Sequence, residues 1–271
     1  MTRALEEDLA GGEDVTSVAT ISEQQISQAQ FCARKSGVVA GIPFAIATLK
    51  KCGITNIQTI NDDGSHINSG DILLRVSGNT RSILLAERTA LNFLCHLSGI
   101  ATLTAKWVKA VAGTQVVIRD TRKTTPGLRV LEKYAVRMGG GANHRMSLSD
   151  AALIKDNHIA AAGDIALAFS AVTSRYPNLE VEVEVDTLEQ LSAALAAGAR
   201  FILLDNMTSD QCREAVKITN GRAKLEASGG LTLESARRYA ETGVDYLAVG
   251  ALTHSAPILD IGLDFLKNSK G

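Results

Sequence analysis

Short apolar runs recur at nearly regular intervals in the second half of the chain. The last four begin at residues 179, 200, 224 and 246, so about 21 to 24 residues separate each start from the next. This interval fits one strand, one helix and their two loops. Helical patterns that end near a glycine fill the intervals, for example 187–199 and 232–244. The alternation predicts right-handed β/α units with a parallel sheet, and we favour a closed α/β barrel over an open sheet.

The first hundred residues follow a different pattern. Strand-like runs at 31–41 and 67–78 are broken by Gly, Asn and Ser, and helical patterns occupy 44–53 and 81–99. This mixture predicts a separate α+β domain with mostly antiparallel strands. We therefore predict an N-terminal α+β sandwich domain over 1–100, a catalytic α/β barrel over 101–254, and a C-terminal tail, 255–271, that joins the first domain.

Composition excludes several classes of protein. The chain has 271 residues, of which 45% are hydrophobic and 21% charged, and these values are typical of a globular protein with a sizeable core. A net charge of -1 and 4% aromatic residues argue against a nucleic-acid or membrane-surface partner. The start of the chain is acidic, unlike a signal peptide, and no apolar run is long enough for a membrane span. Together with four scattered cysteines and no C-x-x-C pair, this predicts a cytoplasmic protein without a disulfide framework or zinc site.

Polar residues follow the expected barrel strands. In a parallel barrel, the active site lies at the carboxyl ends of the strands. Solvated strand tips would explain one or two polar residues, but not charged groups on successive strands, so we expect a catalytic site here. The residues at these ends are Asp120, Arg122, Lys123, Lys155, Asp156, Asn157, His158, Glu182, Glu184, Asp205, Asn206, Glu226 and Ser228.

Positive charge is concentrated between residues 119 and 145. Arg122 and Lys123 stand at a strand end, and His144 and Arg145 follow three glycines. Arginine matches a carboxylate or phosphate with its planar fork, so this segment predicts an anionic substrate. Three other basic residues of the segment, Arg129, Lys133 and Arg137, are spaced four apart, which predicts a solvated helix face.

Arg88 interrupts an apolar stripe on the expected helix at 81–99. Leu84, Leu91 and Cys95 form the rest of that stripe. The side chain either snorkels to solvent or, if the stripe packs against another subunit or domain, needs a buried anion.

Two further features concern a phosphorylated substrate. Glu184 and Asp205 on neighbouring strands form an oxygen-ligand pair suited to Mg²⁺, although the glutamate could instead pair with Lys123 or Lys155. The small residues at 227–230 and 249–251 follow the last two strands, where barrels commonly bind phosphate through backbone N–H groups. These observations predict a barrel enzyme that binds an anion and a phosphate. A class I aldolase with a Schiff base on Lys155 is an alternative.

Two long motifs, DTRKTTPGLR (120–129) and GGGANHRMSLSDAALIKDNH (139–158), resemble quinolinate phosphoribosyltransferase, also called nicotinate-nucleotide pyrophosphorylase (carboxylating), of the type II phosphoribosyltransferases. The likeness extends over essentially the whole chain, including AERTALNFLCHLSGIAT, VEVEVDTLEQ, EASGG and GVDYLAVGALTHS. The chain departs from the family at Cys95, where glutamine or another residue is expected, and at its start, where relatives carry more residues. A ModD-like relative of molybdenum transport shares the fold, but the intact NHR and KDNH segments favour the first family.

The resemblance implies an N-terminal open sandwich with an incomplete TIM-like α/β barrel, assembled as a homodimer or a larger oligomer. It implies that quinolinate and phosphoribosyl pyrophosphate react to nicotinate mononucleotide, pyrophosphate and CO₂ in de novo NAD biosynthesis, with Mg²⁺ and without an organic cofactor.

The resemblance also implies roles for individual residues. Arg122, His144 and Arg145 match the positions that hold the pyridine dicarboxylate, and Arg88 matches an arginine lent by the neighbouring subunit. Lys123 and Lys155 match lysines between the two substrates. Glu184 and Asp205 match the metal and ribose contacts, and the phosphate-binding ends match Ser228, Gly229, Gly230, Gly250 and Ala251.

Overall fold

The computed structural model describes residues 1–266, and the chain divides into two compact units. The first comprises Met1–Leu103, Met138–Gly140 and the residues from Ala256 onward, and the second comprises Thr104–Arg137 and Gly141–Ser255. The last part of the expected C-terminal tail, 267–271, lies outside the described residues. Within residues 1–266, no helix combines the length and hydropathy that a membrane crossing requires.

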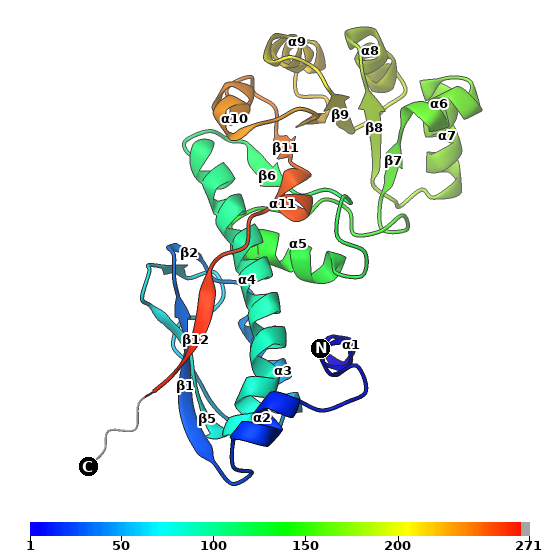
Figure 1. Ribbon diagram of the computed structural model, residues 1–271. Helices are drawn as coiled ribbons and strands as arrows, with labels where there is room; N and C mark the ends of the chain where they lie inside the picture. Colours follow the sequence, from blue (N-terminus) through cyan, green and yellow to red (C-terminus); the bar gives the residue numbers. More distant parts are fainter. Residues whose placement is uncertain (267–271) are drawn as a thin grey trace. The chain divides into compact units, whose positions relative to one another are not determined.

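A four-stranded antiparallel sheet forms the first unit, in the order β12-β1-β5-β3. Strand β1 lies in the middle and pairs with both β12 and β5, so strands from opposite ends of the sequence meet in one sheet (Figure 1). The expectation of mostly antiparallel strands is confirmed. The strands are β1 (Ile26–Ala33), β3 (Asn56–Thr59), β5 (Ile72–Asn79) and β12 (Ile261–Phe265), and β2 (Gly37–Val38) pairs separately with β4 (His66–Ile67).

Helices α3 (Ile42–Lys51) and α4 (Thr80–Ala110) supply much of the core of this unit. Phe31 of β1, Leu49 of α3 and Leu94 of α4 are fully buried in one apolar cluster. The backbone N–H groups of Gly41 and Ile42 at the start of α3 donate to the Asp63 carboxylate, each at 3.0 Å. Two helices, α1 (Thr2–Leu9) and α2 (Val15–Thr20), precede the sheet.

Helix α4 is longer than the sequence pattern predicts. The expected helix ends at Gly99, whereas α4 continues to Ala110. The reason is that Gly99 is needed for packing, not for helix termination: a Cβ atom at this position would lie 2.2 Å from the carbonyl oxygen of Pro257 and 2.9 Å from Cα of Ile258. The glycine lets the segment before β12 pass directly against the helix.

We therefore expect Gly99→Ala to destabilise the protein by roughly 2–4 kcal/mol, because the added methyl group meets backbone, which cannot move aside as a side chain can. The control is Gly12→Ala, whose Cβ would meet only the Leu9 carbonyl oxygen at 3.5 Å. Urea unfolding of both variants measures the difference. Equal midpoints for the two variants would contradict the close approach at Gly99.

Six parallel strands form the second unit, in the order β6-β11-β10-β9-β8-β7. Ala142 extends this sheet beyond β6 through a single parallel bridge to Arg119. No described pairing joins the β6 edge to β7, so the barrel is incomplete, as the resemblance implied, and not closed as the periodicity predicted. The strands are β6 (Val117–Arg119), β7 (Ala152–Ile154), β8 (Val181–Val185), β9 (Phe201–Asp205), β10 (Lys224–Ser228) and β11 (Tyr246–Ala248).

Helices on the outer side of these strands begin close to the strand ends (Figure 1). Thr187, Thr208 and Thr232 each accept a hydrogen bond from a backbone N–H in the first turn of the following helix. Such caps fix short loops between strand and helix. The helices are α5 (Arg129–Met138), α6 (Asp156–Ala162), α7 (Ile165–Arg175), α8 (Leu188–Ala196), α9 (Ser209–Thr219), α10 (Leu233–Ala240) and α11 (Ala251–His254).

Candidate active site

A cavity of about 590 Å³ lies at the carboxyl ends of the parallel strands, entirely within the second unit. This size suits small-molecule substrates. It brings together every residue to which the resemblance gave a role except Arg88: Arg122, Lys123, His144, Arg145, Lys155, Glu184, Asp205, Ser228, Gly229, Gly230, Gly250 and Ala251. The other strand-end residues Asp120, Asp156, Asn157, His158, Glu182 and Asn206 do not line it. Eight further residues line the cavity; of these, the sequence placed Glu226 at a strand end without assigning it a role, and it did not single out Thr121, Leu153 or His254. Glu226 lies in β10, so its place near a strand end could have indicated a role, whereas His254 is the last residue of α11, the short helix after β11.

Two guanidinium groups with unused donors line one part of the cavity. Nε of Arg122 and Nε of Arg145 are both buried without a hydrogen-bond partner in the described chain. Burial lowers the pKa of Arg145, and the positive charge of Arg122 lowers it further. Two neighbouring positive charges with unpaired N–H donors indicate a binding site for an anion. An anion would both offset the charge repulsion and accept hydrogen bonds from the donors.

His144 lies beside these arginines, with both ring nitrogens engaged. Nδ1 accepts the backbone N–H of Arg145 at 2.8 Å, so Nε2 carries the proton and donates it to Glu182 at 2.8 Å. The ring therefore has no free N–H for a substrate carboxylate in this arrangement. In the structure, His144 fixes the backbone of Arg145 by accepting its N–H.

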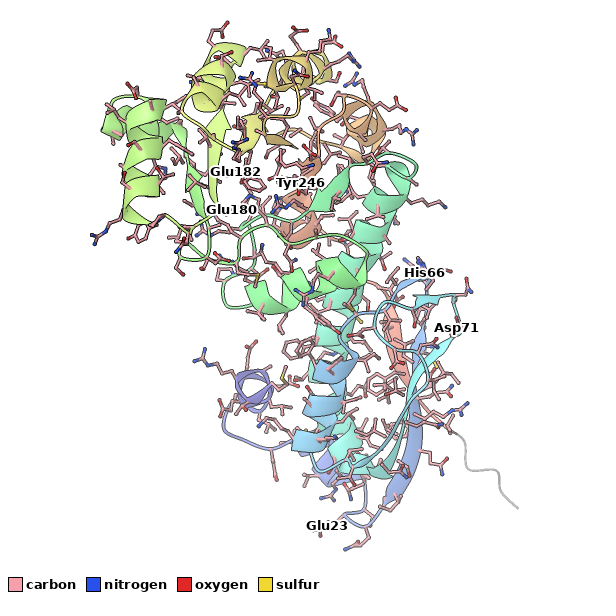
Figure 2. All side chains as sticks on the ribbon, turned by 180° about the vertical axis from the view of Figure 1, so that it is seen from behind. Glu23, His66, Asp71, Glu180, Glu182 and Tyr246 are labelled. Atoms are coloured by element: carbon pink, nitrogen blue, oxygen red, sulfur yellow. The ribbon has the colours of Figure 1, made fainter. Side chains whose placement is uncertain are left out.

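Under the cavity, Glu182 and Glu226 form a buried acidic pair. Figure 2 marks Glu182 on β8 and Tyr246 on β11 in the barrel unit. Arg119 donates to Glu226 Oε2 at 2.8 Å and lies over the Tyr246 ring, 4.5 Å from its centroid. Oε1 of Glu226 has no hydrogen-bond partner among the described residues, although Nε2 of His144 lies 3.5 Å from it. Burial, followed by the negative charge of Glu182, raises the pKa of Glu226 to about 7.

Ligand atoms of His144, Glu182 and Glu226 lie within 4.8 Å of one another, a spacing that a metal ion could bridge. The tautomer of His144 argues against it, because Nε2 keeps its proton while Nδ1 accepts from Arg145. A proton on Glu226 accounts for the acidic pair without a metal ion.

Replacing Glu226 with glutamine tests this protonation. The folded pKa is about 7 against an ordinary value of 4.5, so from about pH 4.5 to 7 only the unfolded chain loses this proton. The contribution of Glu226 to folding stability therefore falls over that window, by about 3 kcal/mol, and levels off above it. Glu226→Gln, which resembles the neutral acid, should show a flatter profile and greater stability than the wild type at pH 8. Urea unfolding at several pH values, with the exposed Glu7→Gln as control, measures this; parallel profiles for wild type and Glu226→Gln would refute it.

Lys155 and Glu184 form an ion pair at the cavity wall. The sequence left open whether Glu184 pairs with Lys123 or with Lys155, and the structure shows the pair with Lys155. The Lys155 amine is engaged by the Glu184 carboxylate, whereas a Schiff-base aldolase needs this amine free to attack a carbonyl, so the structure does not favour that alternative. Asp205 is half-buried and accepts from Asn206 Nδ2 at 2.8 Å.

Glycines at the ends of β10 and β11 allow close approach of the backbone. Gly229 and Gly230 have positive φ angles of 89° and 61°, and a Cβ on Gly229 would lie 2.1 Å from Oδ1 of Asn206. A Cβ on Gly250 would lie 3.1 Å from Lys123 Cδ and 3.2 Å from His254 Nε2. Side chains are thus excluded where a phosphate would need to reach backbone N–H groups.

The prediction that Lys133 lies on a solvated face of its helix, α5, is wrong. Its side chain is fully buried, and its ammonium donates to Asp120 Oδ1 at 2.6 Å. The adjacent Arg129 is half-buried and donates to the Met146 carbonyl at 3.1 Å, whereas Arg137 is exposed. Charge spacing alone could not show this, because α5 buries one face, and three acceptors are present there for the three N–H groups of Lys133.

Arg88 belongs to the first unit and does not line the cavity. Leu91 and Cys95 of its stripe pack on the core of that unit, while Arg88 is exposed and makes no hydrogen bond or ion pair with another described residue. Its predicted role in a neighbouring site stays a prediction.

A barrel with a cationic cavity and glycine-rich strand ends defines an enzyme for anionic, phosphorylated substrates. Residues 14–98 match the N-terminal domain of quinolinate phosphoribosyl transferase, and residues 100–264 match its C-terminal domain. The chain belongs to the quinolinate phosphoribosyltransferase family, and it is a phosphoribosyltransferase. The resemblance in the sequence motifs is thereby confirmed.

Individual relatives agree with this assignment. The chain is 53% identical over 268 residues to nicotinate-nucleotide pyrophosphorylase [carboxylating] of Mycobacterium leprae, with 97% of this chain and 94% of that protein covered. It is 44% identical over 265 residues to the probable enzyme of the same name from Bacillus subtilis, with 95% and 89% covered. Among solved structures, NadC from Streptococcus pyogenes has a TM-score of 0.92 at 41% identity, with 98% and 95% covered. The nicotinate-nucleotide pyrophosphorylase of Francisella tularensis has a TM-score of 0.94 at 40% identity, with 98% and 94% covered.

Proposed function

We propose that the enzyme transfers the phosphoribosyl group of phosphoribosyl pyrophosphate to quinolinate and removes the 2-carboxylate. The products are nicotinate mononucleotide, pyrophosphate and CO₂, in de novo NAD biosynthesis. The observation that carries this proposal is the pair of adjacent guanidinium groups, Arg122 and Arg145, each with a buried unpartnered Nε. Two adjacent carboxylates on a rigid ring are the ligand that two such forks can bind together.

The phosphoribosyl donor occupies the other part of the cavity. Ser228, Gly229 and Gly230 after β10, with Gly250 and Ala251 after β11, bind its phosphate through backbone and hydroxyl groups. Lys123 and Lys155 lie between the two substrates and balance their negative charge. This arrangement presents the ring nitrogen to the anomeric carbon, and such orientation is a large part of the catalytic effect.

Glu184 and Asp205 fit a magnesium ion, because both line the cavity and offer carboxylate oxygens, the ligands that Mg²⁺ prefers. When bound, the ion would stabilise negative charge on the pyrophosphate leaving group. Lys155 holds Glu184 in place at the cavity wall. Both carboxylates also stabilise positive charge on the ribosyl carbon as its bond to pyrophosphate breaks.

The bond changes balance without an organic cofactor. The bond between the ribose C1 and the pyrophosphate oxygen breaks, and its electron pair leaves with pyrophosphate. The ring nitrogen then forms the new bond to C1 and becomes cationic. That ring accepts the electron pair released when the 2-carboxylate departs as CO₂, and a proton from solvent completes C2. Arg122 and Arg145 keep the ring oriented throughout.

We further propose a homodimer in which Arg88 of one subunit contributes to the site of the other. The support is an exposed arginine in the middle of an otherwise apolar stripe, with no partner among the described residues of its own chain. We also propose that the enzyme works in the cytoplasm, which suits its four free thiols.

A substrate comparison tests the function. Purified enzyme with phosphoribosyl pyrophosphate and Mg²⁺ should release CO₂ and pyrophosphate in equal amounts with quinolinate. Nicotinate lacks one carboxylate, and each lost charge-assisted contact should reduce kcat/KM roughly ten- to a hundredfold. Equal use of both substrates, or no product from quinolinate, would reject the proposal.

A further inference from the structure

A group of buried polar side chains outside the cavity lining holds the loop at 143–145. Lys133 of α5 is fully buried, and its ammonium donates three hydrogen bonds. The acceptors are Asp120 Oδ1 at 2.6 Å, the carbonyl oxygen of His144 at 2.6 Å and the carbonyl oxygen of Arg145 at 3.0 Å. One side chain thus satisfies two consecutive backbone carbonyls beside the cavity.

Asp120 completes the attachment from the opposite side. Its Oδ1 also accepts the backbone N–H of His144 at 2.9 Å, and its Oδ2 accepts from Nδ2 of Asn143. Asn143 Nδ2 also donates to the Lys133 carbonyl oxygen at 2.8 Å. Every residue of the loop 143–145 is therefore tied to Asp120, to Lys133 or to both.

We propose that Lys133, paired with Asp120, is a positioning residue for the dicarboxylate substrate. The pair fixes the backbone of 143–145 so that the Arg145 guanidinium is presented to the ligand with Nε free. This inference rests on the proposed function, since quinolinate is the ligand whose binding reports it.

The geometry at Arg145 shows how the positioning works. Its carbonyl oxygen is held by Lys133, its N–H by Nδ1 of His144, and its Nη1 by the Ala151 carbonyl at 3.0 Å. These three contacts leave Nε as the buried donor without a partner. Loss of the Lys133 contacts would leave two carbonyls unpaired and let the loop move, so the guanidinium would no longer be oriented in advance.

Stability alone does not require this ion pair. Burial lowers the pKa of Lys133 and raises the pKa of Asp120, which shows that both charges are costly to keep in place. Apolar or neutral residues of similar volume often replace a buried ion pair without loss of stability. Such residues could not replace the two hydrogen bonds to the carbonyls of His144 and Arg145.

The test uses Lys133→Met and the double variant Lys133→Met/Asp120→Asn. The single variant leaves the buried Asp120 carboxylate without its cation, so the Tm of this variant should fall clearly. The double variant removes both charges and should regain most of that loss. If Lys133 positions the loop, the double variant still has a KM for quinolinate raised about tenfold or more, with the KM for phosphoribosyl pyrophosphate unchanged. A double variant that regains both its Tm and the wild-type quinolinate KM would overturn the proposal.

A matched control and a second measurement sharpen the test. Lys224→Met removes another lysine paired at 2.6 Å, to Asp245, away from this cavity, and should leave both KM values unchanged. Hydrogen exchange of the Arg145 amide, whose acceptor is Nδ1 of His144, needs no substrate; it should be at least tenfold faster in the double variant than in the wild type. Unchanged exchange would overturn the positioning role. Failure of the wild type to bind quinolinate would instead reject the proposed function, while the exchange measurement still decides the role of Lys133.

Discussion

Equal amounts of Arg88→Ala and Lys155→Ala chains, each nearly inactive alone, are expected to regain about a quarter of wild-type activity after subunit exchange. In a mixed dimer, the site that contains Lys155→Ala also receives the altered Arg88. The other site has its own Lys155 and receives Arg88 from the partner, so it is intact. Random pairing makes half of the dimers mixed, and one of the two sites in each of those is active.

The measurement is quinolinate-dependent pyrophosphate release before and after exchange, with exchange itself followed by mass spectrometry of differently labelled chains. Arg88 is exposed and Lys155 lies at the wall of a cavity, so both variants should keep the fold. Confirmed exchange without any recovery would mean that Arg88 acts within its own chain or not at all.

Arg122→Met should lower kcat/KM for quinolinate roughly a hundredfold to ten-thousandfold, as expected for the loss of two charge-assisted hydrogen bonds. The free protein should not become less stable. The Arg122 side chain has no hydrogen-bond partner among the described residues, and its charge works against that of Arg145. Loss of binding without loss of stability is the signature of a side chain kept for its ligand.

Steady-state kinetics and thermal unfolding of the same preparations measure both effects. Arg175→Met, which removes an exposed arginine at the end of α7, is the control for loss of one positive charge and should change neither. Quinolinate kinetics within threefold of wild type for Arg122→Met would show that the two arginines do not clamp the substrate.

Residues at strand ends were predictable from the sequence because the repeat of strand and helix places them at one edge of the barrel. Lys155 follows β7 and Ser228 ends β10, with β8 and β9 between them along the chain, yet both line the cavity. Lys133 was not predictable in this way. Its spacing to Arg129 is that of a solvated face, and only the packing of α5 and the acceptors around its ammonium show that it is buried.

The ends of elements were harder to predict than their presence. Glycine often ends a helix, but in α4 the absence of a side chain at Gly99 lets the backbone at 257–258 pack against the helix. That segment is far away in sequence, so no local pattern could reveal the contact. The hydrogen bonds of His144 are similar, because they depend on Glu182, which comes from a different strand.

The pairing of β12 with β1 bears on how this protein is made. Leu259 and Ile261, from the end of the chain, belong to the same apolar cluster as Phe31 and Leu74 near its start. On a ribosome, residues 104–255 emerge complete before the strand that covers one edge of β1 has been synthesised. Until β12 is synthesised, the N-terminal sheet therefore has an unpaired edge at β1 and a partly exposed core. Unpaired edges and exposed apolar surface favour aggregation and chaperone binding. A chain that stops before β12 would have all strands of the barrel but would lack one edge strand of its N-terminal sheet.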